Sequence, residues 1–255
     1  MRISVRLDGG TGSTVLLPSE IAIDEYEVSK TLSSTVLPGR DGVRENKNLH
    51  RVDTGVIRAS GSFMCASKEA AEETALYYKS LLLDKKGLHV RYNHWDTYLI
   101  ANCVRVIAIL NRGRYGGRLL TLDFLFEVTI PYWFAVESKT VTDTGIEIEI
   151  ENEGGIWTPA IVEIKADGLN LVNPKITNTT NDLEIEYNET VPNGDTIIFD
   201  SERRTAELEG SNVLKDVGTM FLIKGFVLAP GENVLTVEKT SGSHEVKVRF
   251  RERWL

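Results

Sequence analysis

The stretch that decides the fold is Phe221-Leu-Ile-Lys-Gly-Phe-Val-Leu-Ala-Pro-Gly-Glu-Asn-Val-Leu-Thr-Val-Glu-Lys-Thr-Ser-Gly-Ser-His-Glu-Val-Lys-Val-Arg-Phe-Arg-Glu-Arg-Trp-Leu255. Its first apolar run, 221–228, predicts a strand, and Pro230-Gly231 has the residue types of a tight turn. A second strand over 233–239 ends at the turn residues Ser241-Gly242. The last strand alternates apolar and basic residues, which lie on opposite faces: Val246, Val248 and Phe250 against Lys247, Arg249 and Arg251. The pattern predicts an antiparallel β-sandwich, and it holds no catalytic motif.

Residues 137–220 follow the same pattern. Short strands are predicted at roughly ten-residue spacing: Ile146–Glu151, Ala160–Lys165, Leu183–Tyr187, Thr196–Phe199 and Thr205–Leu208. Polar turns separate them at Asp167-Gly168, Asn193-Gly194 and Glu209-Gly210. Even spacing with polar turns is typical of an antiparallel sandwich or jelly roll.

The first half is also rich in predicted strands: Ile3–Leu7, Thr14–Leu17, Leu88–Tyr92, Thr97–Ile109 and Arg118–Ile130. The last of these is nearly apolar on both faces, as a central strand or an interface strand is. Pro131-Tyr132-Trp133 is expected to end this unit.

One helix is predicted, from Ser67 to Lys86. Ser67 is a good N-cap, and three glutamates follow it near the positive end of the helix dipole. The apolar residues recur at helical spacing and predict one buried stripe: Ala71, Ala75, Tyr78 and Leu82. Gly87 is expected to supply the left-handed stop.

A long hairpin is predicted over residues 27–63. Its two strands are joined by Pro38-Gly-Arg-Asp-Gly42, an unusually dense turn sequence. The length favours an arm that extends beyond the domain body, and an ordinary hairpin with a generous loop is the alternative.

Charge divides the chain into two parts. Residues 1–136 hold 17 Lys+Arg and 15 Asp+Glu (net +2), whereas residues 137–255 hold 12 and 22 (net −10). This asymmetry predicts two domains, 1–136 and 137–255, with the boundary near Glu137–Thr144. The acidic half and the scattered basic residues of the first half both argue against binding to nucleic acid or to an anionic membrane.

No signal peptide or apolar span is found, which predicts a protein that stays in the cytoplasm or leaves by another route. Cys65 and Cys103 are expected to be reduced core residues.

Motifs for chemistry are missing from the sequence. His89 and His94 are five apart on an extended segment, so their side chains point to opposite faces and no metal site is predicted. Asn111-Arg-Gly-Arg-Tyr-Gly-Gly117 lies between two strands, which favours a hairpin turn over a phosphate loop. The alternating glutamates of 147–151 favour a solvated sheet face over a pair of catalytic acids. We therefore expect neither an enzyme nor a cofactor.

The order of several stretches resembles the distal tail proteins of long, non-contractile-tailed bacteriophages. In the first half these are Pro38–Gly42, the strand to Gly61, the helix, and Ile130-Pro-Tyr-Trp133. In the second half they are Trp157-Thr-Pro-Ala-Ile-Val-Glu-Ile164, Asn173-Pro-Lys-Ile-Thr-Asn-Thr-Thr180, Gly194-Asp-Thr-Ile-Ile-Phe-Asp200 and Leu228-Ala-Pro-Gly-Glu-Asn-Val-Leu235.

The resemblance implies a mainly β protein of two domains. The first would be a sandwich-like or barrel-like β domain with one helix and a hairpin arm, and the second a galectin-like antiparallel sandwich. It implies a structural virion protein at the tail tip or baseplate, from a phage or prophage and assembled in the bacterial host cytoplasm. Six copies would form an adaptor ring around a channel for DNA, and the arm would embrace the neighbouring copy. The implied partners are the chain itself, the major tail tube protein, a tail-tip hub protein and a receptor-binding protein.

Ring closure predicts an interface made by the turn of the hairpin, the following strand and the apolar strand 119–130. Its members are Pro38, Gly39, Arg40, Asp41, Gly42, Arg51, Arg58, Leu122, Phe124 and Phe126. Two other functions remain open. A carbohydrate-binding sandwich would stack host glycan on aromatic residues such as Trp157, Tyr187 and Trp254, and a β-sandwich glycoside hydrolase would use a glutamate.

Overall fold

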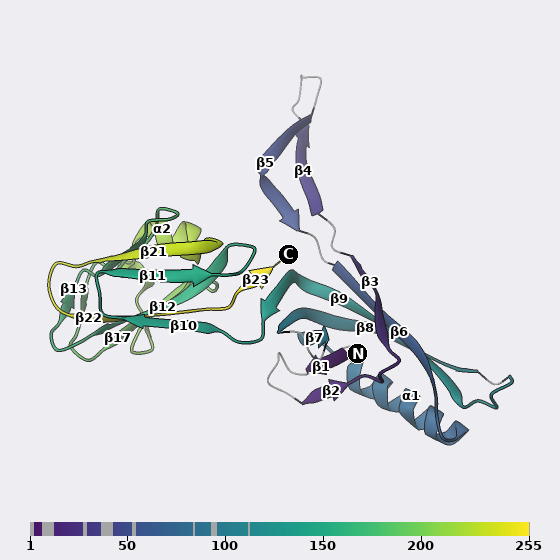
Figure 1. Cartoon of the computed structure of the whole chain (residues 1–255). Helices are drawn as coiled ribbons and strands as arrows, with labels where there is room; N and C mark the ends of the chain where they lie inside the picture. Colours follow the sequence, from purple (N-terminus) through teal and green to yellow (C-terminus); the bar gives the residue numbers. More distant parts are fainter. Residues whose placement is uncertain are drawn as a thin grey trace. The chain divides into compact units, whose positions relative to one another are not determined.

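The chain folds into two compact units, 1–133 and 134–255, in a computed structural model that describes residues 3–6, 13–27, 30–36, 43–52, 55–83, 85–92, 96–111 and 113–254 (Figure 1). The boundary between the units falls within one long strand, β9, whose last residues already belong to the second unit. The predicted domain boundary, 136/137, lies three residues further along the chain.

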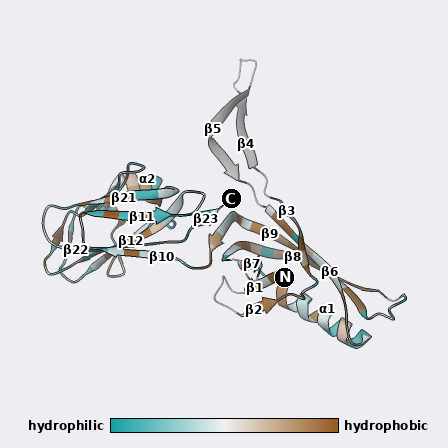
Figure 2. Ribbon diagram, in the orientation of Figure 1, coloured by the Kyte–Doolittle hydropathy of each residue, from teal (hydrophilic) through white to brown (hydrophobic). Residues whose placement is uncertain are grey.

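The first unit is a sheet with the strand order β2-β1-β7-β8-β9-β6-β3. Its strands are β1 (Ile3–Arg6), β2 (Thr14–Leu16), β3 (Ala22–Glu27), β6 (Gly55–Met64), β7 (Leu88–Tyr92), β8 (Thr97–Asn111) and β9 (Leu119–Ala135). All pairings for which a register is given are antiparallel. Hydrophobic residues lie along β8 and β9, as Figure 2 shows in brown.

The helix α1 (Lys68–Leu82) covers one face of this sheet. Ser67 caps it by accepting a hydrogen bond from the Ala70 amide at 3.1 Å, and the predicted stripe of Ala71, Ala75, Tyr78 and Leu82 is buried. The ring of Tyr78 meets Phe124 edge to face, with centroids 5.9 Å apart. The predicted C-terminal end is wrong, because the helix stops at Leu82 and Leu83 is extended. Gly87 does have a positive φ, but in the turn before β7.

The second unit consists of two main antiparallel sheets that enclose an apolar core. The larger has the order β10-β22-β12-β17-β18-β19 and the smaller β11-β21-β14-β15. The larger contains β10 (Lys139–Asp143), β12 (Thr158–Ala166), β17 (Thr196–Asp200), β18 (Thr205–Leu208), β19 (Ser211–Asn212) and β22 (His244–Phe250). The smaller contains β11 (Glu147–Asn152), β14 (Lys175–Asn178), β15 (Leu183–Glu186) and β21 (Gly231–Glu238). Short elements complete the unit: β13 (Leu171–Val172), β16 (Thr190–Val191), a 3₁₀ turn at Leu214–Asp216, α2 (Thr219–Lys224), β20 (Val227–Leu228) and β23 (Arg253–Trp254).

Strand alternation in this unit follows the sequence closely. In β22, Val246, Val248 and Phe250 are buried, while Lys247 and Arg249 pair with Glu163 of β12 on the other face. The expected turn glycines have positive φ: Gly168, Gly194, Gly210, Gly231 and Gly242. The mainly β fold is therefore confirmed.

Three predictions about element bounds are wrong. The run 221–228 is not one strand: the helix α2 buries Phe221, Gly225 ends the helix with a φ of +70°, and β20 follows. Short apolar runs give no periodicity that separates a strand from a helix. Strand β9 continues through Pro131 to Ala135. Ile146, expected in a strand, lies before β11 and is 71% exposed.

Candidate assembly interfaces

The face of the first sheet that points away from its core is a candidate interface. Strands β6, β8 and β9 lie side by side, and alternate residues of each point outward. We call the following residues the outer face: Val56, Arg58, Ser62 and Met64 of β6, Arg105, Ile107 and Ile109 of β8, and Thr121, Asp123 and Leu125 of β9. Several of its apolar side chains are exposed, with Met64 50% and Ile109 57% exposed. Exposed apolar side chains gathered on one sheet are typical of a protein–protein contact.

An ion cluster lies among these apolar residues. The Asp123 carboxylate accepts a hydrogen bond from Arg58 at 3.0 Å, and the Arg105 guanidinium lies 4.0 Å from the same oxygen. The Ser62 and Thr121 hydroxyls are 2.7 Å apart on the adjacent pair of residues. The other oxygen of Asp123 is buried and has no hydrogen-bond partner within the described chain. The contacts with Asp123 hold Arg58 and Arg105 on an exposed surface. Arginine is a residue that protein–protein interfaces favour.

The structure places the predicted interface residues in three different settings. Arg58 lies on the outer face. Leu122, Phe124 and Phe126 are fully buried in the core of their own unit, because inward positions of β9 alternate with outward ones. A neighbouring copy has no access to them, so we correct that part of the prediction and assign these three to the core. Arg51 belongs to β5, and Pro38, Gly39, Arg40, Asp41 and Gly42 lie outside the described residues.

The predicted arm divides into two parts. Its outer part is a ribbon of β4 (Lys30–Val36) and β5 (Val43–Val52), which form a two-stranded sheet of their own. Its inner part, β3 and β6, belongs to the main sheet of the first unit. Among the described residues, β4 and β5 have no other strand partner.

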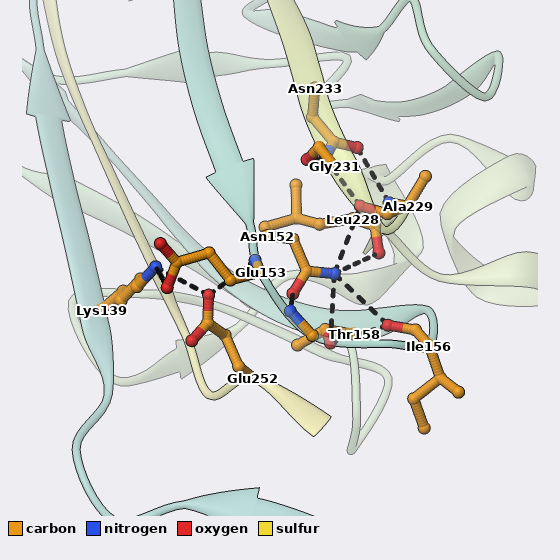
Figure 3. Close-up of polar contacts among 11 residues, drawn as sticks. Lys139, Asn152, Glu153, Ile156, Thr158, Leu228, Ala229, Gly231, Asn233 and Glu252 are labelled. Atoms are coloured by element: carbon orange, nitrogen blue, oxygen red, sulfur yellow. Dashed lines mark hydrogen bonds and ion pairs between the residues drawn. The ribbon is translucent and has the colours of Figure 1, made fainter. Parts of the chain in front are cut away.

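The second unit has a buried polar cluster built on asparagines (Figure 3). The Asn152 amide donates to the carbonyl oxygens of Leu228 and Ala229 at 3.3 and 3.2 Å. The Asn233 amide oxygen accepts from the Ala229 amide at 2.8 Å, and its nitrogen donates to the Ala229 and Gly231 carbonyls at 2.8 and 3.0 Å. These side chains satisfy the backbone of the 228–231 turn, so the cluster is structural.

A second group of charged residues lies next to Asn152 of the asparagine cluster. Glu252 is buried, accepts from the Glu153 amide at 2.8 Å and lies 2.7 Å from the Lys139 ammonium (Figure 3). Lys139 also contacts the Glu153 carboxylate at 2.8 Å. Hydrogen bonds to Glu153 and Glu252 raise the pKa of Lys139, because they favour its charged form. These contacts connect Glu252 with Lys139 of β10 and with Glu153, the residue after β11.

The aromatic residues proposed for glycan stacking differ in exposure. Tyr187 is buried, and burial raises the pKa of its phenol. Tyr187 is therefore a core residue, and its ring is not open for stacking on a sugar. Trp157 is 54% exposed and remains available for a ligand.

The ring of His244 is buried at the start of β22. Its Nδ1 is 2.8 Å from the Lys239 ammonium, and its Nε2 is 3.1 Å from the Gly145 carbonyl oxygen. An ammonium only donates, so Nδ1 accepts, Nε2–H donates to Gly145, and the ring is neutral. Burial lowers the pKa of His244, since it penalises the charged ring, and Lys239 acts in the same direction; the Gly145 carbonyl and Asp143 oppose them.

This lowered pKa predicts that the second unit loses stability in acid. Above the unfolded-state pKa of about 6.5, both states hold a neutral ring and stability is unaffected. As the pH falls from there toward the folded-state pKa, the unfolded chain binds the proton first and the free energy of unfolding drops. Urea denaturation between pH 7.5 and 5 should show a steeper loss for the wild type than for His244→Gln. Equal pH dependence of the two proteins would contradict this assignment.

Neither helix of the described chain has the length and apolar character of a membrane span. Within the same residues, no group of three or more His, Cys, Asp or Glu side chains is arranged to hold a metal ion.

Comparisons with known proteins give one match to a family model, and it lies within the second unit. Residues 153–254 match the family model described as "Siphovirus-type tail component, C-terminal domain". No curated protein sequence matches the chain.

The fold of the whole chain is similar to a solved structure. It is that of the Dit protein (gp 19.1) of phage SPP1, at 11% identity and a TM-score of 0.73, covering 99% of both chains. The SPP1 protein is described as a paradigm of the hub adsorption apparatus in phages that infect Gram-positive bacteria. A chain of the phage P2 baseplate, in its activated conformation with calcium, matches at 8% identity and a TM-score of 0.48, covering 98% of this chain and 97% of that one. The resemblance to distal tail proteins is thus confirmed by a family match in the second unit and by a shared fold overall.

Proposed function

We propose that this chain is a distal tail protein, a structural component of a phage tail that acts through protein–protein contacts. The family match of residues 153–254 and the fold shared with SPP1 Dit support this role. The finer proposal is that six copies form a ring that joins the tail tube to the tail tip or baseplate. In the virion, the ring would surround a channel for DNA.

The β4–β5 ribbon is the observation that carries the ring proposal. A two-stranded ribbon on its own is marginally stable in water, because it buries little apolar surface. Within the described chain, β4 and β5 pair only with one another. A ribbon of this kind gains stability when a second protein covers it. In a closed ring built from head-to-tail contacts, each subunit covers the ribbon of its neighbour, so every ribbon is covered.

The outer face of the first sheet offers a second surface for assembly. It combines exposed Met64 and Ile109 with the two arginines held by Asp123. Its chemistry is that of a mixed apolar and polar contact, with arginine beside apolar anchors. A tail tube protein on one side of the ring and a tail-tip hub protein on the other are the proposed partners. A receptor-binding protein is a further proposed partner. Assembly would take place in the bacterial host cytoplasm.

Removal of the ribbon tests the ring proposal. We expect native mass spectrometry of the purified chain to show six copies, and replacement of residues 30–52 by a short Gly-Ser linker to give monomers. Ile146→Ser, which changes an exposed apolar residue of the second unit, is the control and should leave six copies. A hexamer that survives removal of the ribbon would contradict the role given to the arm.

Glycan binding by the second unit is the second candidate function, and the exposed Trp157 favours it. Aromatic faces stack on sugar rings when they are open to solvent, as Trp157 is. Trp157→Ala would abolish binding to a glycan array if the indole were the stacking platform. Unchanged or absent binding by both proteins would remove this candidate.

A further inference from the structure

A cavity of about 280 Å³ lies at one end of three adjacent strands, β12, β17 and β22, of the larger sheet of the second unit. It is lined by residues of β12, β17, β22 and β23, by the turn after β17, and by Ser138 and Arg251. The arginines among them are Arg203, Arg249, Arg251 and Arg253, and the acids are Asp200 and Glu202. Four guanidinium groups around one small cavity are unusual for a structural cluster, because each carries a full positive charge.

Strand register accounts for this gathering. Ile161 of β12 pairs with Arg249 of β22 on one side and with Asp200 of β17 on the other, so the three residues form one row across the sheet. Arg203 follows in the turn after β17, with its Nε 3.8 Å from the Asp200 carboxylate. Arg253 of β23 completes the arrangement, with a 2.8 Å contact to Glu202 and the ring of Phe134 4.9 Å from its guanidinium carbon.

Arginines outnumber acids in the lining. It holds four arginines and two acids, and Glu163, which does not line the cavity, pairs with Arg249. The surrounding half of the chain has a net charge of −10, from 12 Lys+Arg and 22 Asp+Glu over 137–255.

We propose that this cavity binds the phosphate group of a small hydroxylated phosphate ester. Guanidinium groups recognise phosphate through paired, charge-assisted hydrogen bonds. A tetrahedral phosphate has oxygens directed to several sides and suits arginines that approach from different segments. A planar carboxylate fits one guanidinium fork. Asp200 and Glu202 add carboxylate oxygens at the rim, and these accept hydrogen bonds from ligand hydroxyls.

Titration calorimetry with the full-length chain tests this site, using glycerol 3-phosphate as the ligand and inorganic phosphate, acetate and glycerol for comparison. Ionic strength is held constant, because surface charges alone bind anions in dilute salt. We expect saturable binding of glycerol 3-phosphate, weaker binding of inorganic phosphate, and none of acetate or glycerol.

Two pairs of variants separate the cavity from general electrostatics. Arg249→Gln and Lys247→Gln remove one charge each from the same strand, and both residues pair with Glu163, but only Arg249 lines the cavity. Arg203→Gln and Lys215→Gln each change a side chain that is more than 80% exposed, and only Arg203 lines the cavity. Both arginine variants should weaken binding about tenfold or more, as the loss of a charged hydrogen bond does, and both lysine variants should stay within about twofold of the wild type.

These outcomes decide the proposal whether or not the chain forms a ring. No saturable binding of glycerol 3-phosphate by the wild type would overturn it. Equal losses in the arginine and lysine variants would overturn it as well, because they would indicate unspecific attraction. Equal binding of acetate would exclude phosphate as the group recognised.

Discussion

Phe124→Ala is expected to lower the free energy of unfolding of the first unit by about 3 to 5 kcal/mol, the usual cost of removing a buried phenylalanine. Phe124 is fully buried, meets Tyr78 of the helix edge to face and stacks on Phe126 at 6.2 Å between centroids. The substitution therefore leaves a cavity between sheet and helix. Hydrogen exchange in urea, followed by mass spectrometry of peptides from β9, measures this unit separately from the second.

Leu125→Ala is the matched control, because Leu125 is the next residue of the same strand and is half-buried on the outer face. Its loss should cost less than about 1 kcal/mol. If Phe124→Ala instead left stability unchanged and only altered the number of associated copies, Phe124 would be an interface residue, and its assignment to the core would be wrong.

Asn233→Ala is expected to destabilise the second unit by about 3 kcal/mol or more. The substitution leaves the Ala229 amide without its acceptor, removes one of the two acceptors of the Asn178 side-chain nitrogen, and takes a donor from the Ala229 and Gly231 carbonyl oxygens. Each buried polar group that loses its partner costs about 1 to 3 kcal/mol. Urea denaturation of the full chain, with hydrogen exchange of peptides from β21 as the readout, measures the effect.

Asn188→Ala provides the comparison for this prediction. Asn188 is exposed and makes one side-chain hydrogen bond to the Asp216 carbonyl at 3.2 Å. Its loss should stay within about 0.5 kcal/mol, as for most surface substitutions. Similar effects of the two substitutions would show that the asparagine cluster does not support the 228–231 turn.

Local patterns were sufficient to predict much of the fold. Alternation predicted the buried face of β22, and helical spacing predicted all four buried residues of α1. Glycine positions predicted the turns, because few other residues accept a positive φ. The predictions failed where one sequence pattern is compatible with two different local structures. The apolar run 221–228 has no period that distinguishes α2 from a strand, and Pro131 did not stop β9.

The predicted interface set mixed residues that face inward with residues that face outward. Residues 119–130 are apolar enough on both faces that the inward Leu122, Phe124 and Phe126 were taken for contact residues. The outward set became visible only with the strand register, which brings Arg58 and Arg105 to Asp123. The buried asparagines were missed for a related reason. Asn in a sequence indicates turns, and burial of its amide depends on backbone groups from distant segments.

The same dependence on register hides the arginine cavity. Arg249 and Arg251 appeared in the sequence as the solvent face of an alternating strand. Their approach to Arg203 requires β22, β12 and β17 to lie side by side. An alternating basic face therefore gives no sign of a binding site until the neighbouring strands are known.

Electron microscopy of the purified full-length chain tests the central claim, assembly into a ring, most directly. The account predicts particles with sixfold symmetry and a central hole, in which density for the 30–52 ribbon of each subunit lies against the adjacent subunit. Isolated single subunits at all protein concentrations, or closed assemblies in which each ribbon contacts only its own subunit, would contradict it.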